Sequence, residues 1–202
     1  MNRRNLLKLT GLALIGNLMG RPFLVQAQNR KDGMGALMAI KTRHSIRSYS
    51  KAPVSDEIIR EILHCAMSAP SAHDEDPWEF IVVKDKNLLS EIADRNSNVE
   101  FTKNAPAGIL VCLDEDKQQN QGYGVEAVSC AAENILIAAS ALGLGACWTE
   151  GWPIEKRVKN YRDIFDLSKN ILPICFIVVG HLTSRNSSVH SFDENKVHFD
   201  RW

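Results

Sequence analysis

The stretch that decides the fold is VEAVSCAAENILIAASALGLGACWT, residues 125–149. Apolar residues recur with helical spacing over 125–142, which predicts a long helix with one buried face. Gly143 and Gly145 end that helix, since glycine is favoured just beyond a helix terminus. The residues ACWT at 146–149 then predict a short strand. A long helix that leads directly into a strand indicates a sheet covered by helices.

The same periodicities, read outward from this stretch, predict the remaining elements. Helices are expected at 32–41, 55–67, 88–95 and 154–161, and strands at 78–83, 107–113 and 174–179. Helices outnumber strands and are interleaved with them, so we predict an α/β or α+β sandwich with one sheet between helices. The composition does not choose the strand order. No repeat or low-complexity tract divides residues 28–202, which we interpret as one domain.

The first 27 residues are interpreted as an export signal and kept apart from the fold. Arg3-Arg4-Asn5-Leu6-Leu7-Lys8 resembles the bacterial twin-arginine motif, and Val25-Gln26-Ala27 has the small-x-Ala pattern of a cleavage site. The apolar run between them is shorter than the about 20 residues that span a bilayer. We therefore expect a twin-arginine signal peptide at 1–27, export by that machinery, and a periplasmic protein. The alternative is an uncleaved membrane anchor facing the periplasm.

Charge argues against a nucleic-acid partner. Residues 1–27 hold four basic residues and no acidic one, so 20 of the 24 basic residues face all 24 acidic residues in the remainder. That slightly acidic balance offers no basic surface for a phosphate backbone. The five cysteines each lie in an apolar stretch and are interpreted as buried thiols, with one disulfide left open; they are Cys65, Cys112, Cys130, Cys147 and Cys175.

Residues 43–47, RHSIR, form the first candidate site. In an extended chain Arg43, Ser45 and Arg47 project from one face, because strand side chains alternate. Arginine binds phosphate through paired hydrogen bonds and stays charged, so this face suits a dianionic phosphate. A solvated basic edge strand is the competing interpretation, and the pattern alone does not exclude it.

Four ordered segments together resemble the FMN-dependent nitroreductase family. The first is RHSIR, which is similar to the family's phosphate-binding segment. The others are similar to its APSxxNxQPWxF, ALGLGxxW and C-terminal VHxxxW motifs; they are APSAHDEDPWEF at 69–80, LGLGACW at 142–148 and VHFDRW at 197–202. These segments cover nearly all of the chain beyond the signal.

The resemblance implies an α+β fold with a mixed, mainly antiparallel sheet between helices, in a homodimer whose tails exchange between subunits. It implies FMN as cofactor, bound at two interface sites. By position, the phosphate and ribityl chain are held by Arg43, His44, Ser45 and Arg47, and the isoalloxazine ring is lined by Pro70, Ser71 and Asp74. Glu150-Gly151 places backbone N–H groups near flavin N5. The flavin carries the chemistry, so no catalytic side chain and no metal are expected.

Two departures from the family pattern concern cofactor affinity. Asp74 and Asp76 stand where the family commonly has Asn and Gln, and an ionised carboxylate can accept but not donate a hydrogen bond. The basic phosphate ligand expected before the C-terminal motif is absent from Ser187-Ser188-Val189-His190-Ser191, and Arg185 is a candidate substitute.

We therefore predict an FMN-dependent oxidoreductase that reduces small electron-poor acceptors, such as nitroaromatics or quinones, in two half-reactions. An electron donor from the cell envelope is possible. Two alternatives stay open: a dedicated flavin reaction, such as dehalogenation or azoline oxidation, or a non-catalytic flavin-binding protein. Two competing motifs are weaker. Residues 122–127 fit GxGxxA but follow no strand, and the acidic run at 73–76 consists of adjacent residues that rarely converge on one ion.

Overall fold

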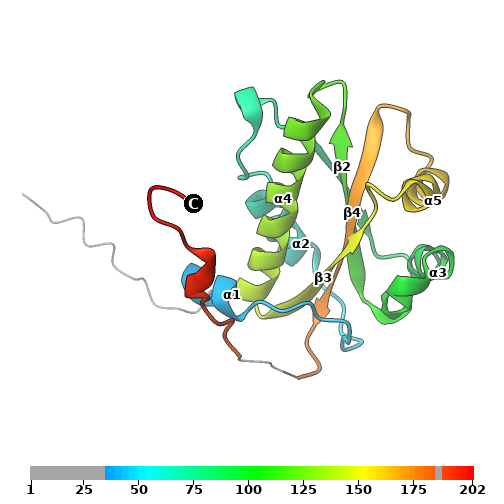
Figure 1. The fold of residues 1–202 in the computed structure, drawn as a ribbon. Helices are drawn as coiled ribbons and strands as arrows, with labels where there is room; N and C mark the ends of the chain where they lie inside the picture. Colours follow the sequence, from blue (N-terminus) through cyan, green and yellow to red (C-terminus); the bar gives the residue numbers. More distant parts are fainter. Residues whose placement is uncertain (1–34, 185–187) are drawn as a thin grey trace, which may run out of the picture. The chain divides into compact units, whose positions relative to one another are not determined.

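The computed structural model describes residues 35–184 and 188–202, and of residues 97 and 98 only the backbone. The predicted signal peptide at 1–27 lies outside these ranges. A four-stranded sheet in the order β1-β2-β4-β3 is the centre of the domain (Figure 1). The strands are β1 (Trp78–Val83), β2 (Ala107–Asp114), β3 (Leu144–Glu150) and β4 (Ile171–His181).

All three strand pairs are antiparallel, and β1 and β3 form the two edges of the sheet. The β2–β4 register shifts between Val111 and Cys112, where Pro173 lies on the partner strand. Proline has no N–H to donate to the ladder and is tolerated in sheets at such irregular positions. The expected antiparallel character is confirmed, and the one parallel pairing of the described residues is an isolated bridge between Ser45 and Ala146.

Helices cover both faces of the sheet. They are α1 (Ala36–Thr42), α2 (Asp56–Ala66), α3 (Lys86–Arg95), α4 (Gln121–Ala141) and α5 (Glu155–Phe165), with short 3-10 helices η1 (Ala72–Asp74), η2 (Ser97–Asn104) and η3 (Glu194–Lys196). Residues of α2 and α4 pack with Ile109 and Val111 on one face. Residues of α3 and α5 pack with Leu110 and Phe176 on the other. This alternation along β2 is what a strand buried on both faces requires.

The long helix α4 packs closely on the sheet because one of its residues is a glycine. A Cβ at Gly124 would lie 2.6 Å from Leu113 Cδ1, so a larger residue would push the helix away from β2. Among the described residues, α4 is also the helix whose length and composition could cross a membrane. The apolar side of α4 is part of the core, which accounts both for its close packing on β2 and for its apolar composition.

The predicted elements are present, but several boundaries differ. Helix α4 begins at Gln121, four residues before the predicted start, because Asn120 caps it through hydrogen bonds from the N–H groups of Gly122 and Tyr123. The 3-10 helix η2 was not predicted. All five cysteines are free thiols. The prediction of buried thiols is confirmed for Cys112, Cys147 and Cys175, while Cys65 is only half-buried. It is wrong for Cys130, which is exposed on α4, because its apolar sequence neighbours lie on other faces of the helix.

Candidate functional site

The RHSIR segment runs along the edge of the sheet. Helix α1 ends at Thr42, and Arg43 has extended dihedrals, so the chain continues as a strand-like segment beside β3. The Ile46 N–H donates to Ala146 O at 2.9 Å, beside the Ser45–Ala146 bridge. A Cβ on Gly145 would lie 2.7 Å from Ile46 Cγ2, so only glycine allows this close approach. Gly145 therefore lies in β3 and serves this close approach, whereas Gly143, with left-handed dihedrals, follows the end of α4.

A second contact fixes the far end of this segment. Tyr49 forms an antiparallel bridge with Leu182, and its hydroxyl donates to the Ile46 carbonyl. Burial raises the pKa of Tyr49, so the phenol stays protonated and keeps that hydrogen bond. Residues 45–49 are thus held at both ends, which limits the entropy that they lose when a ligand binds.

The structure brings Arg43, Ser45 and Arg47 together around Cys147 of β3. Burial raises the pKa of the Cys147 thiol, while the Arg47 guanidinium, the Ser45 hydroxyl and Arg43 act on that pKa in the opposite direction. Arg43 also approaches Glu133 of α4, with Nε 3.7 Å from Oε1. Arg47 is exposed and forms no ion pair with any described residue. The pairing of this segment with β3 and the alternation of its side chains thus leave all three groups close enough to Cys147 to act on its pKa.

His44 makes a different set of contacts. Its Nδ1 donates to Thr42 O at 2.7 Å, and its Nε2 lies 3.1 Å from Ser188 Oγ in the C-terminal tail. The rings of His44 and His190 stack with centroids 4.5 Å apart, and the His190 imidazole donates from Nε2 to Arg43 O at 2.9 Å. The structure thus engages the imidazole of His44 with the tail, a contact that no local sequence pattern indicates.

The Glu150-Gly151 pair lies where β3 ends. Glu150 Oε2 accepts a hydrogen bond from Arg157 Nη1 at 2.8 Å. The Gly151 N–H donates to Ile174 O at 2.9 Å, so in this conformation it is not available to a cofactor. The expectation that Glu150-Gly151 places backbone N–H groups near flavin N5 stays a prediction; the chain turns back here and pairs the Gly151 N–H with β4. Gly151 still has a clear role, since a Cβ there would lie 2.7 Å from Pro173 O.

The loop with Pro70, Ser71 and Asp74 follows α2. The Ser71 hydroxyl donates to Asp76 Oδ1 at 2.8 Å and accepts from the Asp76 N–H at 3.1 Å. Asp76 therefore holds the loop together through Ser71. Three residues of this loop have left-handed dihedrals, a conformation that Asp and Asn tolerate better than most residues; they are His73, Asp74 and Asp76. Asp74 is exposed.

Within one chain, this loop and the arginine segment lie at opposite ends of α4. The loop contacts the beginning of α4, where Gln118 Nε2 bonds Glu75 Oε2 at 2.5 Å. Arg43 instead meets Glu133, and Figure 1 shows α1 beside the end of the helix. The rise of an α-helix is about 1.5 Å per residue, so Gln121 and Glu133 are about 18 Å apart along the axis. The structure does not bring all the predicted site residues together in one chain.

Comparisons with known proteins agree with this architecture. Residues 40–99 and 93–181 match the model of the Nitroreductase family. A Methanothermobacter thermautotrophicus protein named as an NADH dehydrogenase/NAD(P)H nitroreductase is 38% identical over 178 residues, which cover 88% of this chain and 93% of the relative.

Two solved structures have the same fold. One is a Bacteroides thetaiotaomicron protein named as an NADH dehydrogenase/NAD(P)H nitroreductase, with a TM-score of 0.79 and 37% identity, covering 84% of this chain and 99% of that chain. The other is a nitroreductase in complex with FMN from Desulfovibrio desulfuricans, with a TM-score of 0.71 and 28% identity, covering 83% of this chain and 97% of that chain.

Proposed function

The chain belongs to the nitroreductase family and is an FMN-dependent oxidoreductase, and we propose that its acceptors are flat, electron-poor molecules such as nitroaromatics and quinones. The observation that carries the proposal is the pairing of the extended segment with β3 at Ser45 and Ile46, which puts Arg43 and Arg47 on either side of the Ser45–Ala146 bridge. The polar stretch between β2 and α4 is short, which leaves little chain to cover a pocket and favours a broad choice of acceptor.

The donor set at this edge fits the phosphate of FMN. Arg47 has a full complement of N–H donors and no carboxylate partner among the described residues, and Arg43 is only loosely paired with Glu133. Charge-assisted hydrogen bonds from two guanidinium groups would bind a phosphate dianion, and the Ser45 hydroxyl would add a third donor. The stretch before the C-terminal motif lacks the basic phosphate ligand that is usual in the family. His190, which belongs to that stretch, lies beside the arginine segment, stacked on His44 and bonded to Arg43 O.

The site is complete only when two copies of the chain meet. Pro70, Ser71 and Asp74 would line the isoalloxazine ring of a cofactor whose phosphate is held by the partner's arginine segment, because one chain separates the two sets along α4. A homodimer also explains several large apolar side chains left in solvent: Leu37 at 73%, Phe192 at 74%, Phe199 at 84% and Trp202 at 101% exposed. Exposed apolar groups of this size are characteristic of interfaces.

FMN, when bound, supplies the two-electron chemistry of the reaction. The residues of the chain hold and orient it. Arg43, Ser45 and Arg47 bind the phosphate, and the Ser71–Asp76 hydrogen bonds fix the loop that presents Asp74. Arg157 holds the Glu150 carboxylate beside the end of β3. No side chain is required to act as a nucleophile.

We also propose that the protein is exported. Support comes from Arg3-Arg4 and the Val25-Gln26-Ala27 pattern, which together fit a cleaved twin-arginine signal and a periplasmic location. A periplasmic enzyme would be separated from cytoplasmic NAD(P)H, so a quinol or another donor of the envelope would reduce it. An uncleaved anchor would place the same domain at the membrane.

An absorption spectrum with a donor and acceptor panel tests this function. We expect purified protein to show a visible flavin band that dithionite bleaches and that a nitroaromatic or a quinone restores. In stopped-flow mixing we expect slower reduction by NADH and NADPH than by a quinol. A protein that binds no flavin would contradict the function. Efficient and specific oxidation of NADPH would contradict only the proposed location and donor.

A further inference from the structure

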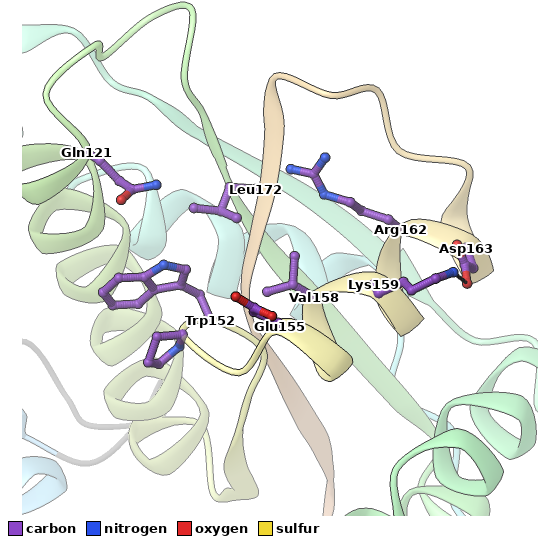
Figure 2. Close-up of a pocket in the computed structure, with 9 residues that line it drawn as sticks. Gln121, Trp152, Glu155, Val158, Lys159, Arg162, Asp163 and Leu172 are labelled. Carbon is purple, nitrogen blue, oxygen red and sulfur yellow. Dashed lines mark hydrogen bonds and ion pairs between the residues drawn. The ribbon is translucent and has the colours of Figure 1, made fainter.

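A hollow of about 630 Å³ lies beyond the end of β3, between the start of α4 and helix α5 (Figure 2). The first residues of β4, 171–174, lie beyond the last β3 pair, Glu150 with Cys175, so no described strand pairs with them on the β3 side, although β2 pairs with residues 171–173 on the other. The hollow is lined by Gln121, Trp152, Pro153, Glu155, Val158, Lys159, Arg162, Asp163 and Leu172. Its volume is in the range of small-molecule sites.

Among the described residues, Arg162 is the charged group of this hollow that has no carboxylate partner and has one unpaired nitrogen. Its Nη2 donates to Lys169 O at 3.1 Å, and its Nε is buried with no hydrogen-bond partner. No carboxylate of the described residues forms an ion pair with it. By contrast, Arg157 on the same helix forms an ion pair, with its Nη1 2.8 Å from Glu150 Oε2. A half-buried guanidinium without a counter-charge is costly, and an anionic ligand would offset that cost.

The acidic residues that line the hollow do not supply a counter-charge to Arg162. Lys159 Nζ lies 2.6 Å from Asp163 Oδ2, so these two charges neutralise each other. Arg95 also approaches Asp163, at 3.9 Å. Glu155 is exposed in the first turn of α5, where water screens its charge. The Nη1 donors of Arg162 therefore remain free for a carboxylate or phosphate oxygen.

The opposite side of the hollow is formed by the Trp152 indole, with the Gln121 amide on the same side. In Figure 2 the Trp152 indole lies across the hollow from Arg162, with Leu172 and Val158 between them. Trp152 is only half buried, so part of its ring stays accessible to a ligand. Aromatic rings bind well against such surfaces.

We propose that this hollow binds a flat aromatic anion, with its carboxylate on Arg162 and its ring against Trp152. Nothing in the cofactor site described above uses Arg162, and the site is independent of the proposed oxidoreductase activity. Isothermal titration of the FMN-loaded protein with 2-naphthoate, and with neutral 2-naphthamide as the matched ligand, tests it.

We expect naphthoate to bind about 10-fold more tightly than naphthamide, as a charged hydrogen bond would provide. Arg162→Met should abolish this preference, whereas Arg60→Met, the same change on the exposed face of α2, should keep it. Glu155→Gln should leave the preference for naphthoate in place, because the charge of this exposed residue is screened by water. Trp152→Leu should lower the affinity for both ligands, because it removes the aromatic surface.

Equal binding of the two ligands, or no binding, would overturn the proposal. So would naphthoate binding that survives Arg162→Met and perturbs the visible flavin band, because the ligand would then lie on the cofactor. The flavin content, read from the same absorption spectrum, separates each of these outcomes from a failure of the oxidoreductase function.

Discussion

Replacing Arg43 and Arg47 together with alanine should lower FMN affinity by about 3 to 6 kcal/mol, or roughly 150- to 20,000-fold. Each guanidinium would make a charge-assisted hydrogen bond to the phosphate, and each such bond contributes about 1.5 to 3 kcal/mol. Both groups converge beside Cys147 at the edge of the sheet, and neither supports the core. Titration of apo-protein with FMN, followed by flavin fluorescence, measures the change.

The single variants should each lose about half of that free energy, and Arg60→Ala on α2 should lose none. Riboflavin, which lacks the phosphate, should bind the double variant and the parent with similar affinity. This ligand control separates a lost phosphate contact from a damaged fold. Unchanged FMN affinity in the double variant would show that the phosphate lies elsewhere.

Gly151→Ala should both destabilise the protein and remove the cofactor. A Cβ at this position would lie 2.7 Å from the Pro173 carbonyl oxygen and 3.1 Å from the Ile174 carbonyl oxygen, and neither backbone atom can move without shifting β4. Overpacking of this kind costs about 1 to 3 kcal/mol. The same clash would strain the hydrogen bond from the Gly151 N–H to Ile174 O, and the end of β3 beside Glu150 would move.

Urea denaturation and flavin content measure the two effects of Gly151→Ala. Gly35→Ala is a suitable control, because no atom of the described residues other than its chain neighbours lies within 4 Å of its Cβ position. A Gly151→Ala protein with the stability and flavin content of the parent would show that the end of β3 does not constrain the cofactor.

Much of the fold follows from local patterns. The apolar runs of β2 and β4 and the helical spacing of α4 are strong signals, because both faces of the sheet are buried and the strands carry almost no polar residues. Boundaries are less certain from sequence. Gly122 and Gly124 look like turn residues, yet the Asn120 cap and the close packing on Leu113 place them in the helix.

In the candidate site, too, some features follow from local sequence and others depend on the tertiary structure. The arginine segment could be predicted because alternation along an extended chain is a local property. The partners of the Gly151 N–H and the stacking of His190 on His44 depend on chain segments far apart in sequence, so no local pattern reveals them. The separation of the ring-lining loop from the arginines along α4 requires the tertiary structure.

The central claim is that each FMN site combines the arginine segment of one chain with the 70–74 loop of another. The direct measurement is the flavin content of mixed dimers formed by coexpressing differently tagged Arg47→Ala and Ser71→Trp chains and purifying them through both tags. Each variant alone should hold little flavin, and Ser71→Trp should melt within a few degrees of the parent.

A mixed dimer of Arg47→Ala and Ser71→Trp has one site with both changes and one with neither, as a two-fold interface requires. We predict that it holds about half of the parent's flavin per chain. Mixing Arg47→Ala with Arg43→Ala, two changes in the same segment, should restore none. Flavin content as low in the first mixture as in this control would contradict the claim and place the whole site within one chain.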